Sequence, residues 1–260
     1  MARIALVLEY DGRAFYGWQR QQDLPSVQAA LEEAVSGIAA HPVQTVCAGR
    51  TDTGVHASAQ VVHFDTDARR PLTAWVRGTN ALLLEAIAVR AALVVPEDFH
   101  ARYSAIRRRY RYVLLNRPQR PGLWSGRVGW LHVSLDLVAM KEAAACLIGE
   151  HDFSAFRAAE CQAKNPVRRM MRAEVRQQGE CFVFDFEANA FLHHMIRNLV
   201  GSLVYVGKGA WTPARFQDVL AGCDRRAAAP TFAPDGLYFQ GAVYDAPYDI
   251  PDVTGNGVWP

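Results

Sequence analysis

The chain has 260 residues, half of them apolar, and carries 28 basic against 26 acidic side chains. This length and apolar content suffice for one large domain or two medium ones, and they exclude a disordered chain. The formal net charge of +2 does not by itself indicate a polyanionic partner. Five scattered cysteines without a Cys-x-x-Cys pair favour a reduced, cytoplasmic protein. Glu9 interrupts the first apolar run, so neither a signal peptide nor a membrane span is expected there.

The first part of the chain alternates strand and helix patterns. Residues 4–10 are aliphatic and predict a strand that ends at the turn signal Asp11-Gly12. Ser26 is a good N-cap for a helix whose apolar side chains form one stripe over 27–38. Further strands are expected at 43–47, 60–64 and 87–95, and a helix at 72–83. This order is typical of a ferredoxin-like sheet, antiparallel with helices on one face, as in RNA-recognition motifs.

The second part repeats this order loosely. We therefore expect an α+β fold with two ferredoxin-like (RNA-recognition-motif-like) halves, residues 1–104 and 105–246, and a Pro- and Gly-rich tail over 247–260. The expected strands are 109–115, 172–177, 181–187 and 241–244, and the expected helices are 135–148 and 191–206.

The loop between the strands 43–47 and 60–64 carries a candidate catalytic acid. Asp52 lies between two threonines, with Gly49 and Gly54 further out and Arg50 two positions before it. Glycine permits a positive φ or a close backbone approach, and threonine hydroxyls can hold a carboxylate. A nearby guanidinium favours the ionised carboxylate, which suits a nucleophile or base better than a general acid. The alternative is a structural Asx-turn in a strand connection.

A basic, aromatic strand follows the expected boundary. Arg108, Tyr110, Tyr112 and Leu114 alternate onto one face of it. Such a strand can hold a nucleic acid through phosphate contacts and stacking, and it fits equally well an aromatic pair in a core beside a solvated arginine face.

The expected helix 191–206 places His193 and Arg197 four residues apart, so that a cation on this side could meet an anion such as Asp52. The adjacent His193 and His194 would lie on different helix faces and chelate poorly. With no His-x-x-x-His motif, Cys/His cluster, P-loop or dinucleotide fingerprint, we expect neither a metal nor a small-molecule cofactor.

Six segments together resemble one family, the TruA-type tRNA pseudouridine synthases. The segment 48–57 (AGRTDTGVHA) matches the catalytic motif of that family almost residue for residue. The others are 10–12 (YDG) with Phe15 and 17–21 (GWQRQ), 99–102 (FHAR), 109–112 (RYRY), 189–198 (NAFLHHMIRN) and 236–237 (GL). The loop 231–237 otherwise departs from the family pattern, and no role is assigned to the tail through Trp259.

The resemblance implies the fold and the function. It implies two halves with sheets joined across a central cleft, acting as a cytoplasmic homodimer that converts uridine to pseudouridine at positions 38–40 in the anticodon stem-loop of tRNA. By this resemblance Asp52 is the catalytic aspartate, Arg50 helps to displace the target nucleotide, Tyr110 stacks on the uracil and takes its C5 proton, and Arg197 pairs with Asp52. The remaining substrate contacts that it implies are Gln19, His56, Phe99, His100, Ala101, Arg102, Tyr103, Lys164 and Leu237.

Two rival functions use the same features. Asp52-Thr53-Gly54 is also the tripeptide of aspartic proteases, where two such loops share a proton, so the single copy here would require a dimer. The more serious rival is an RNA-binding module of the same fold without catalysis. In that case the carboxylate of Asp52 would be dispensable.

Overall fold

The computed structural model describes residues 1–253. These residues divide into two compact units, one formed by residues 1–108 with 238–253, and one formed by 109–237. The expected boundary at 104/105 thus differs by four residues from this division, and the last strand groups with the first unit instead of the second. The reason is backbone pairing, because Tyr238 and Phe239 lie opposite His56 and Ala57 in parallel register.

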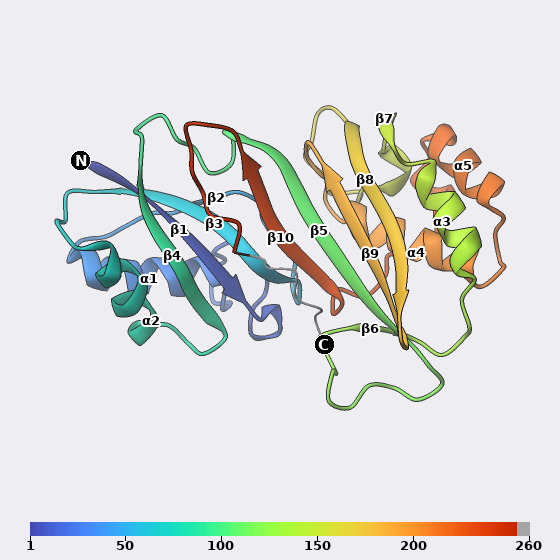
Figure 1. Cartoon of the computed structure of the whole chain (residues 1–260), viewed down its shortest axis with the longest axis horizontal. Coiled ribbons are helices and arrows are strands. Elements are labelled where there is room, and N and C mark those ends of the chain that lie inside the picture. Colours follow the sequence, from blue (N-terminus) through green and yellow to red (C-terminus); the bar gives the residue numbers. More distant parts are fainter. Residues whose placement is uncertain (254–260) are drawn as a thin grey trace. The chain divides into compact units, whose positions relative to one another are not determined.

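The first unit is a sheet with short helices (Figure 1). Its strands follow the order β4-β1-β3-β10, with β2 paired to β3, and β1 is antiparallel to both of its neighbours. The elements are β1 (Ala2–Tyr10), α1 (Val27–Ala39), β2 (Val46–Cys47), β3 (His56–Thr66), α2 (Thr79–Leu82), β4 (Ile87–Val95) and β10 (Leu237–Tyr244), with the 3-10 turn η1 (Gly12–Ala14) and the π-helical turn η2 (Ala74–Gly78).

Apolar side chains from β1, β3 and α1 form the core of the first unit. The five residues from Ile4 to Leu8 are all buried, as are Leu31 and Val35 on α1. Ser26 caps α1 as predicted, since its hydroxyl accepts a hydrogen bond from the Ala29 amide at 3.3 Å. The strand ends, where β1 and β3 leave this core, are therefore held firmly.

The second unit has the strand order β5-β9-β8-β7, with β6 added in parallel to β5. Its elements are β5 (Ala105–Asn116), β6 (Gly129–Leu131), α3 (Leu137–Ala145), β7 (Gly149–Asp152), η3 (Ser154–Phe156), β8 (Val167–Gln178), β9 (Cys181–Ala188), α4 (Met195–Gly207), α5 (Pro213–Gly222) and η4 (Arg225–Ala227). The predicted hairpin is confirmed, with Gly179 at φ 57° in the turn between β8 and β9.

Two expected helices differ from those observed. The helix expected from residue 191 begins at Met195, because His194 adopts φ 60° and interrupts the helical backbone. The helix expected over 72–83 is split into the π-helical turn η2 and the single α-helical turn α2.

At the level of class, the expected fold is confirmed as mixed α+β with mostly antiparallel strand pairs. All five cysteines are free thiols. Within residues 1–253, no helix combines the length and apolarity that a membrane crossing requires. Part of the tail packs back on the first unit, with the Tyr248 ring 5.1 Å from that of Phe99, while Trp259 lies outside the described residues.

Candidate active site

Asp52 lies in a tight turn between β2 and β3, as predicted. The Val55 amide donates to the Asp52 carbonyl at 3.1 Å, and Gly54 has the positive φ of 78° that the third residue of a type II turn requires. Asp52 itself is half-buried and Arg50 is exposed. The turn therefore presents a carboxylate and a guanidinium from a backbone of fixed shape.

The segment after β1 packs closely against this turn. The Trp18 amide donates to the Thr51 carbonyl at 3.0 Å, and Gly17 adopts φ 91° there. A Cβ atom on Gly17 would lie 2.8 Å from the same carbonyl oxygen, and one on Gly12 would lie 2.1 Å from the Val55 carbonyl oxygen. Both glycines are thus explained by close backbone approach to the loop that carries Asp52.

Two buried side chains contact the same loop directly. The Tyr10 hydroxyl lies 2.8 Å from the Thr51 hydroxyl, and the Gln60 side-chain amide donates to the Gly49 carbonyl at 2.5 Å and accepts from the Gly49 amide at 3.4 Å. The sequence analysis missed Gln60. The sequence feature that could have identified Gln60 is its polar side chain within the apolar strand β3. Such a side chain is rarely buried unless it has hydrogen-bond partners.

His56 was implied as a substrate contact, but it is 3% exposed. Its Nδ1 accepts from the Gly12 amide at 3.1 Å and lies 3.3 Å from a carboxylate oxygen of Asp11, and its ring stacks on Tyr238 at 4.7 Å. Burial alone would raise the pKa of Asp11, but hydrogen bonds from Arg13 and the charge of nearby groups lower it to about 2. In the described structure, His56 thus packs between the segment after β1 and β10.

Tyr110 and Arg197 belong to the second unit. Tyr110 is half-buried on β5, and its ring meets that of Phe191 edge-to-face at 5.0 Å. Arg197, also half-buried, lies on the first turns of α4 and donates from Nε to the Phe232 carbonyl at 2.8 Å. The Phe232 amide donates back to the Arg197 carbonyl at 3.2 Å. Both candidate residues therefore have contacts that restrict their rotamers.

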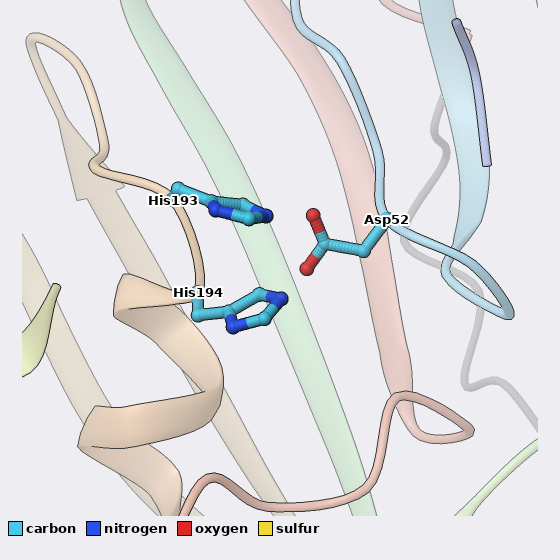
Figure 2. Close-up of side chains that lie close together, drawn as sticks. All are labelled: Asp52, His193 and His194. Atoms are coloured by element: carbon cyan, nitrogen blue, oxygen red, sulfur yellow. The ribbon is translucent and has the colours of Figure 1, made fainter. Parts of the chain in front are cut away.

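The histidine pair does not have the geometry expected of it. Figure 2 shows His193 and His194 on the segment that leads into α4, and Asp52 on its loop. Because neither histidine lies within the helix, their rings are not on separate helix faces but stand 4.0 Å apart. For the same reason, the spacing argument that aligned His193 with Arg197 does not hold.

The segment from Phe99 to Tyr103 divides into buried and exposed residues. Phe99 and Ala101 are fully buried, so their side chains pack in the interior and support the segment. Tyr103 is 76% exposed and packs on the ring of His100 at 4.4 Å, and the Arg102 guanidinium lies 5.6 Å from the Tyr103 ring centre. An exposed stack of this kind suits a nucleobase.

Three further implied contacts are Gln19, Lys164 and Leu237. Gln19 and Lys164 are exposed. Leu237 is buried at the start of β10, where its amide donates to the Pro234 carbonyl at 2.8 Å. Its side chain is thus part of the packing in the described structure.

Comparisons with known proteins agree with the motifs. A family model described as tRNA pseudouridine synthase matches residues 6–104 and 143–245. The chain is 63% identical over 250 residues to the tRNA pseudouridine synthase A of Dechloromonas aromatica, covering 96% of this chain and 95% of that protein. It is 58% identical to that of Nitrosomonas eutropha, covering 96% and 90%, and 56% identical to that of Chromobacterium violaceum, covering 96% and 95%.

The chain belongs to the tRNA pseudouridine synthase family. The family and the class of enzyme expected from the sequence, an isomerase that makes pseudouridine in tRNA, are confirmed. Among solved structures, a chain of a Cbf5-Nop10-Gar1 complex aligns with 90% of this chain and 57% of its own length at 10% identity, with a TM-score of 0.35 that supports no conclusion.

Proposed function

We propose that this protein isomerises uridines at positions 38–40 in the anticodon stem-loop of tRNA, with Asp52 as the catalytic carboxylate. The observation that carries the proposal is the turn itself. Asp52 is half-buried on a backbone fixed from both sides, with exposed Arg50 beside it, inside the segment that matches the family's catalytic motif. A structural Asx-turn would not need this much support for its main chain.

The reaction is balanced within the nucleotide. The bond between C1′ and N1 breaks, the uracil turns, a bond forms between C1′ and C5, and the C5 proton leaves while N1 gains one. There is no net oxidation or reduction. An ionised carboxylate can attack C1′ or remove the 2′ proton, and both routes give Asp52 a role next to the ribose.

The remaining roles follow the family motifs. A uridine in a stem must be unstacked and turned out at a cost of a few kcal/mol. We propose that Arg50 offsets part of this cost by contacting the displaced strand, that Tyr110 stacks on the uracil and takes the C5 proton, and that Arg197 pairs with Asp52. Exposed Arg102 and Tyr103 would contact the RNA beyond the target base.

The finer fold and the assembly belong to the same proposal. The order strand, helix, strand, strand, helix, strand from β1 to β4 supports a ferredoxin-like first half. A similar second half, joined sheets with a central cleft, a homodimer and action in the cytoplasm rest on the family resemblance. Two measurements would test the assembly: a band at the mass of a dimer on a gel, and the molar mass from light scattering with and without RNA.

Asp52→Asn is the decisive variant. We expect it to abolish pseudouridine formation on tRNA transcripts while tRNA binding persists, because the amide keeps the shape and removes the charge. Asp23→Asn is the matched control, since Asp23 is an exposed acid of the same unit at φ 60°, where asparagine fits equally well. Pseudouridine mapping in tRNA from a deletion strain complemented by each variant reads out reaction and position together. Retained isomerisation in Asp52→Asn would contradict the assignment of Asp52 as the catalytic carboxylate.

Tyr110→Phe tests the second role. Removing the hydroxyl leaves the ring that packs on Phe191, so we expect unchanged tRNA affinity and a large loss of turnover. A parallel fall of affinity and turnover would contradict a role in proton transfer.

A further inference from the structure

The strands on both sides of the Asp52 loop contribute buried polar groups to it. Tyr10 ends β1 and is 4% exposed, while Gln60 lies within β3 and is fully buried. Packing alone would not favour polar side chains at these two positions, because a buried polar group without a hydrogen-bond partner destabilises the fold. Instead, both side chains form hydrogen bonds with residues of the loop itself.

These contacts hold the part of the loop that precedes Asp52. Gln60 fixes the Gly49 peptide by accepting from its amide at 3.4 Å and donating to its carbonyl at 2.5 Å. Tyr10 holds the Thr51 hydroxyl at 2.8 Å, and the Trp18 amide holds the Thr51 carbonyl at 3.0 Å. Gly49 and Thr51, which lie three residues and one residue before Asp52, are thus both hydrogen-bonded to side chains of the core strands.

We propose that Tyr10 and Gln60 are positioning residues for catalysis. They act through the loop backbone and set the direction in which the Asp52 side chain leaves it. This inference rests on the proposed function, since it assumes that Asp52 is the reacting carboxylate. Displacement of a reacting group by about 1 Å can cost about 100-fold in rate while substrate affinity is kept. The loss should therefore appear in kcat and not in KM.

The Tyr10–Thr51 pair permits a double-mutant cycle. Tyr10→Phe and Thr51→Val each delete one partner with little change of volume, and Thr51→Ser keeps the hydroxyl. We expect each deletion to lower kcat about 10- to 100-fold with unchanged KM for tRNA, the double variant to be no worse than either single one, and Thr51→Ser to recover most of the rate. Gln60→Met, which keeps length and burial, should show the same split between kcat and KM.

Thr66→Val is the matched control. Thr66 is a buried threonine at the far end of β3, and its hydroxyl contacts His41 Nε2 at 2.7 Å and the Ala68 amide at 3.1 Å. Its loss should lower the thermal midpoint as much as Thr51→Val does and leave kcat unchanged. This comparison separates a general loss of stability from misplacement of Asp52.

Three outcomes overturn the inference: unchanged kcat in Tyr10→Phe and Gln60→Met, equal losses of kcat in Thr66→Val and Thr51→Val, or strictly additive effects in the cycle. Full activity in Asp52→Asn, measured in the same assay, would instead remove the proposed function. If Asp52→Asn is inactive and the positioning variants are fully active, only the inference fails.

Discussion

Replacement of His63 by asparagine is expected to remove much of the acid sensitivity of the first unit. His63 lies on β3, is 5% exposed, and accepts the Ala101 amide at Nδ1 at 3.1 Å. Burial first, and then the charges of Arg3 and His100, lower the pKa of His63 to about 4, although Asp65 acts in the opposite direction. Protonation at Nδ1 would also break the hydrogen bond that holds the segment from Phe99 to Tyr103.

The size of the stability loss at acid pH follows from the linkage between proton binding and folding. A histidine with a folded pKa of about 4 and an ordinary value of 6.5 binds its proton more readily in the unfolded chain, so stability is lost as pH falls from 6.5 toward 4. At pH 5 the loss amounts to about 2 kcal/mol, and below pH 4 it reaches about 3 kcal/mol, at 1.36 kcal/mol per pKa unit. Above pH 7 the contribution vanishes.

Urea unfolding at pH 7.5, 6 and 5 measures this loss. In His63→Asn the side-chain oxygen can accept the Ala101 amide at every pH, so the decline between pH 7.5 and pH 5 should shrink by about 2 kcal/mol. His100 leaves a residual slope, because burial lowers its pKa as well. His132→Asn, at an exposed position, should retain the decline of the unmodified protein. Equal slopes in the His63 variant and the unmodified protein would refute the reasoning.

Three further substitutions test other parts of the structure. Gly12→Ala should cost about 1–3 kcal/mol and most of the activity, because its Cβ would meet the Val55 carbonyl oxygen at 2.1 Å; Gly122→Ala, with nothing within 4 Å, is the control in the same thermal and turnover assays. Asp185→Asn should lower the free energy of unfolding by about 3 kcal/mol in urea titrations, since it leaves the guanidiniums of Arg111 and Arg176 without their buried carboxylate; a change no larger than that of exposed Asp23→Asn would disprove this. Asn198→Leu should cost about 2–3 kcal/mol by calorimetry, because it removes the donor to the Phe156 carbonyl and the acceptor of the Thr231 hydroxyl; a neutral effect would contradict the hydrogen bonds assigned to Asn198.

Local patterns predicted the elements that are long and regular. The cap at Ser26, the aliphatic run of β1 and the strand β4 all carry their signal within a few residues, and the structure has them where expected. The start of α4 was misplaced because Leu192 continues the apolar stripe, whereas the backbone at His194 is left-handed. The helix α5 was missed although Thr212 and Pro213 form a recognisable start signal.

The residues of the candidate site that lie within a sequence motif could be predicted. Those that depend on contacts between distant parts of the chain could not. Asp52 and Arg50 could be identified as candidates from the residues next to them in the loop. The contact of Gln60 with Gly49 joins residues 11 apart, and that of Tyr10 with Thr51 joins residues 41 apart. No local pattern contains these pairs. The burial of His56 depends likewise on Gly12 and Tyr238, which lie on other elements.

The two units fix the segments that carry their candidate catalytic side chains by the same physical means. In the first, backbone groups of the Asp52 loop are bound by Gln60 and Trp18; in the second, the Phe232 main chain binds Arg197 from both its amide and its carbonyl. Main-chain groups are present in every residue type, so the loop 231–237 can depart from the family pattern and still hold Arg197. Because these bonds form on folding, the entropy of ordering the Asp52 loop and the Arg197 side chain is lost before substrate binds. Under the proposed function, this leaves binding energy available for turning out the uridine.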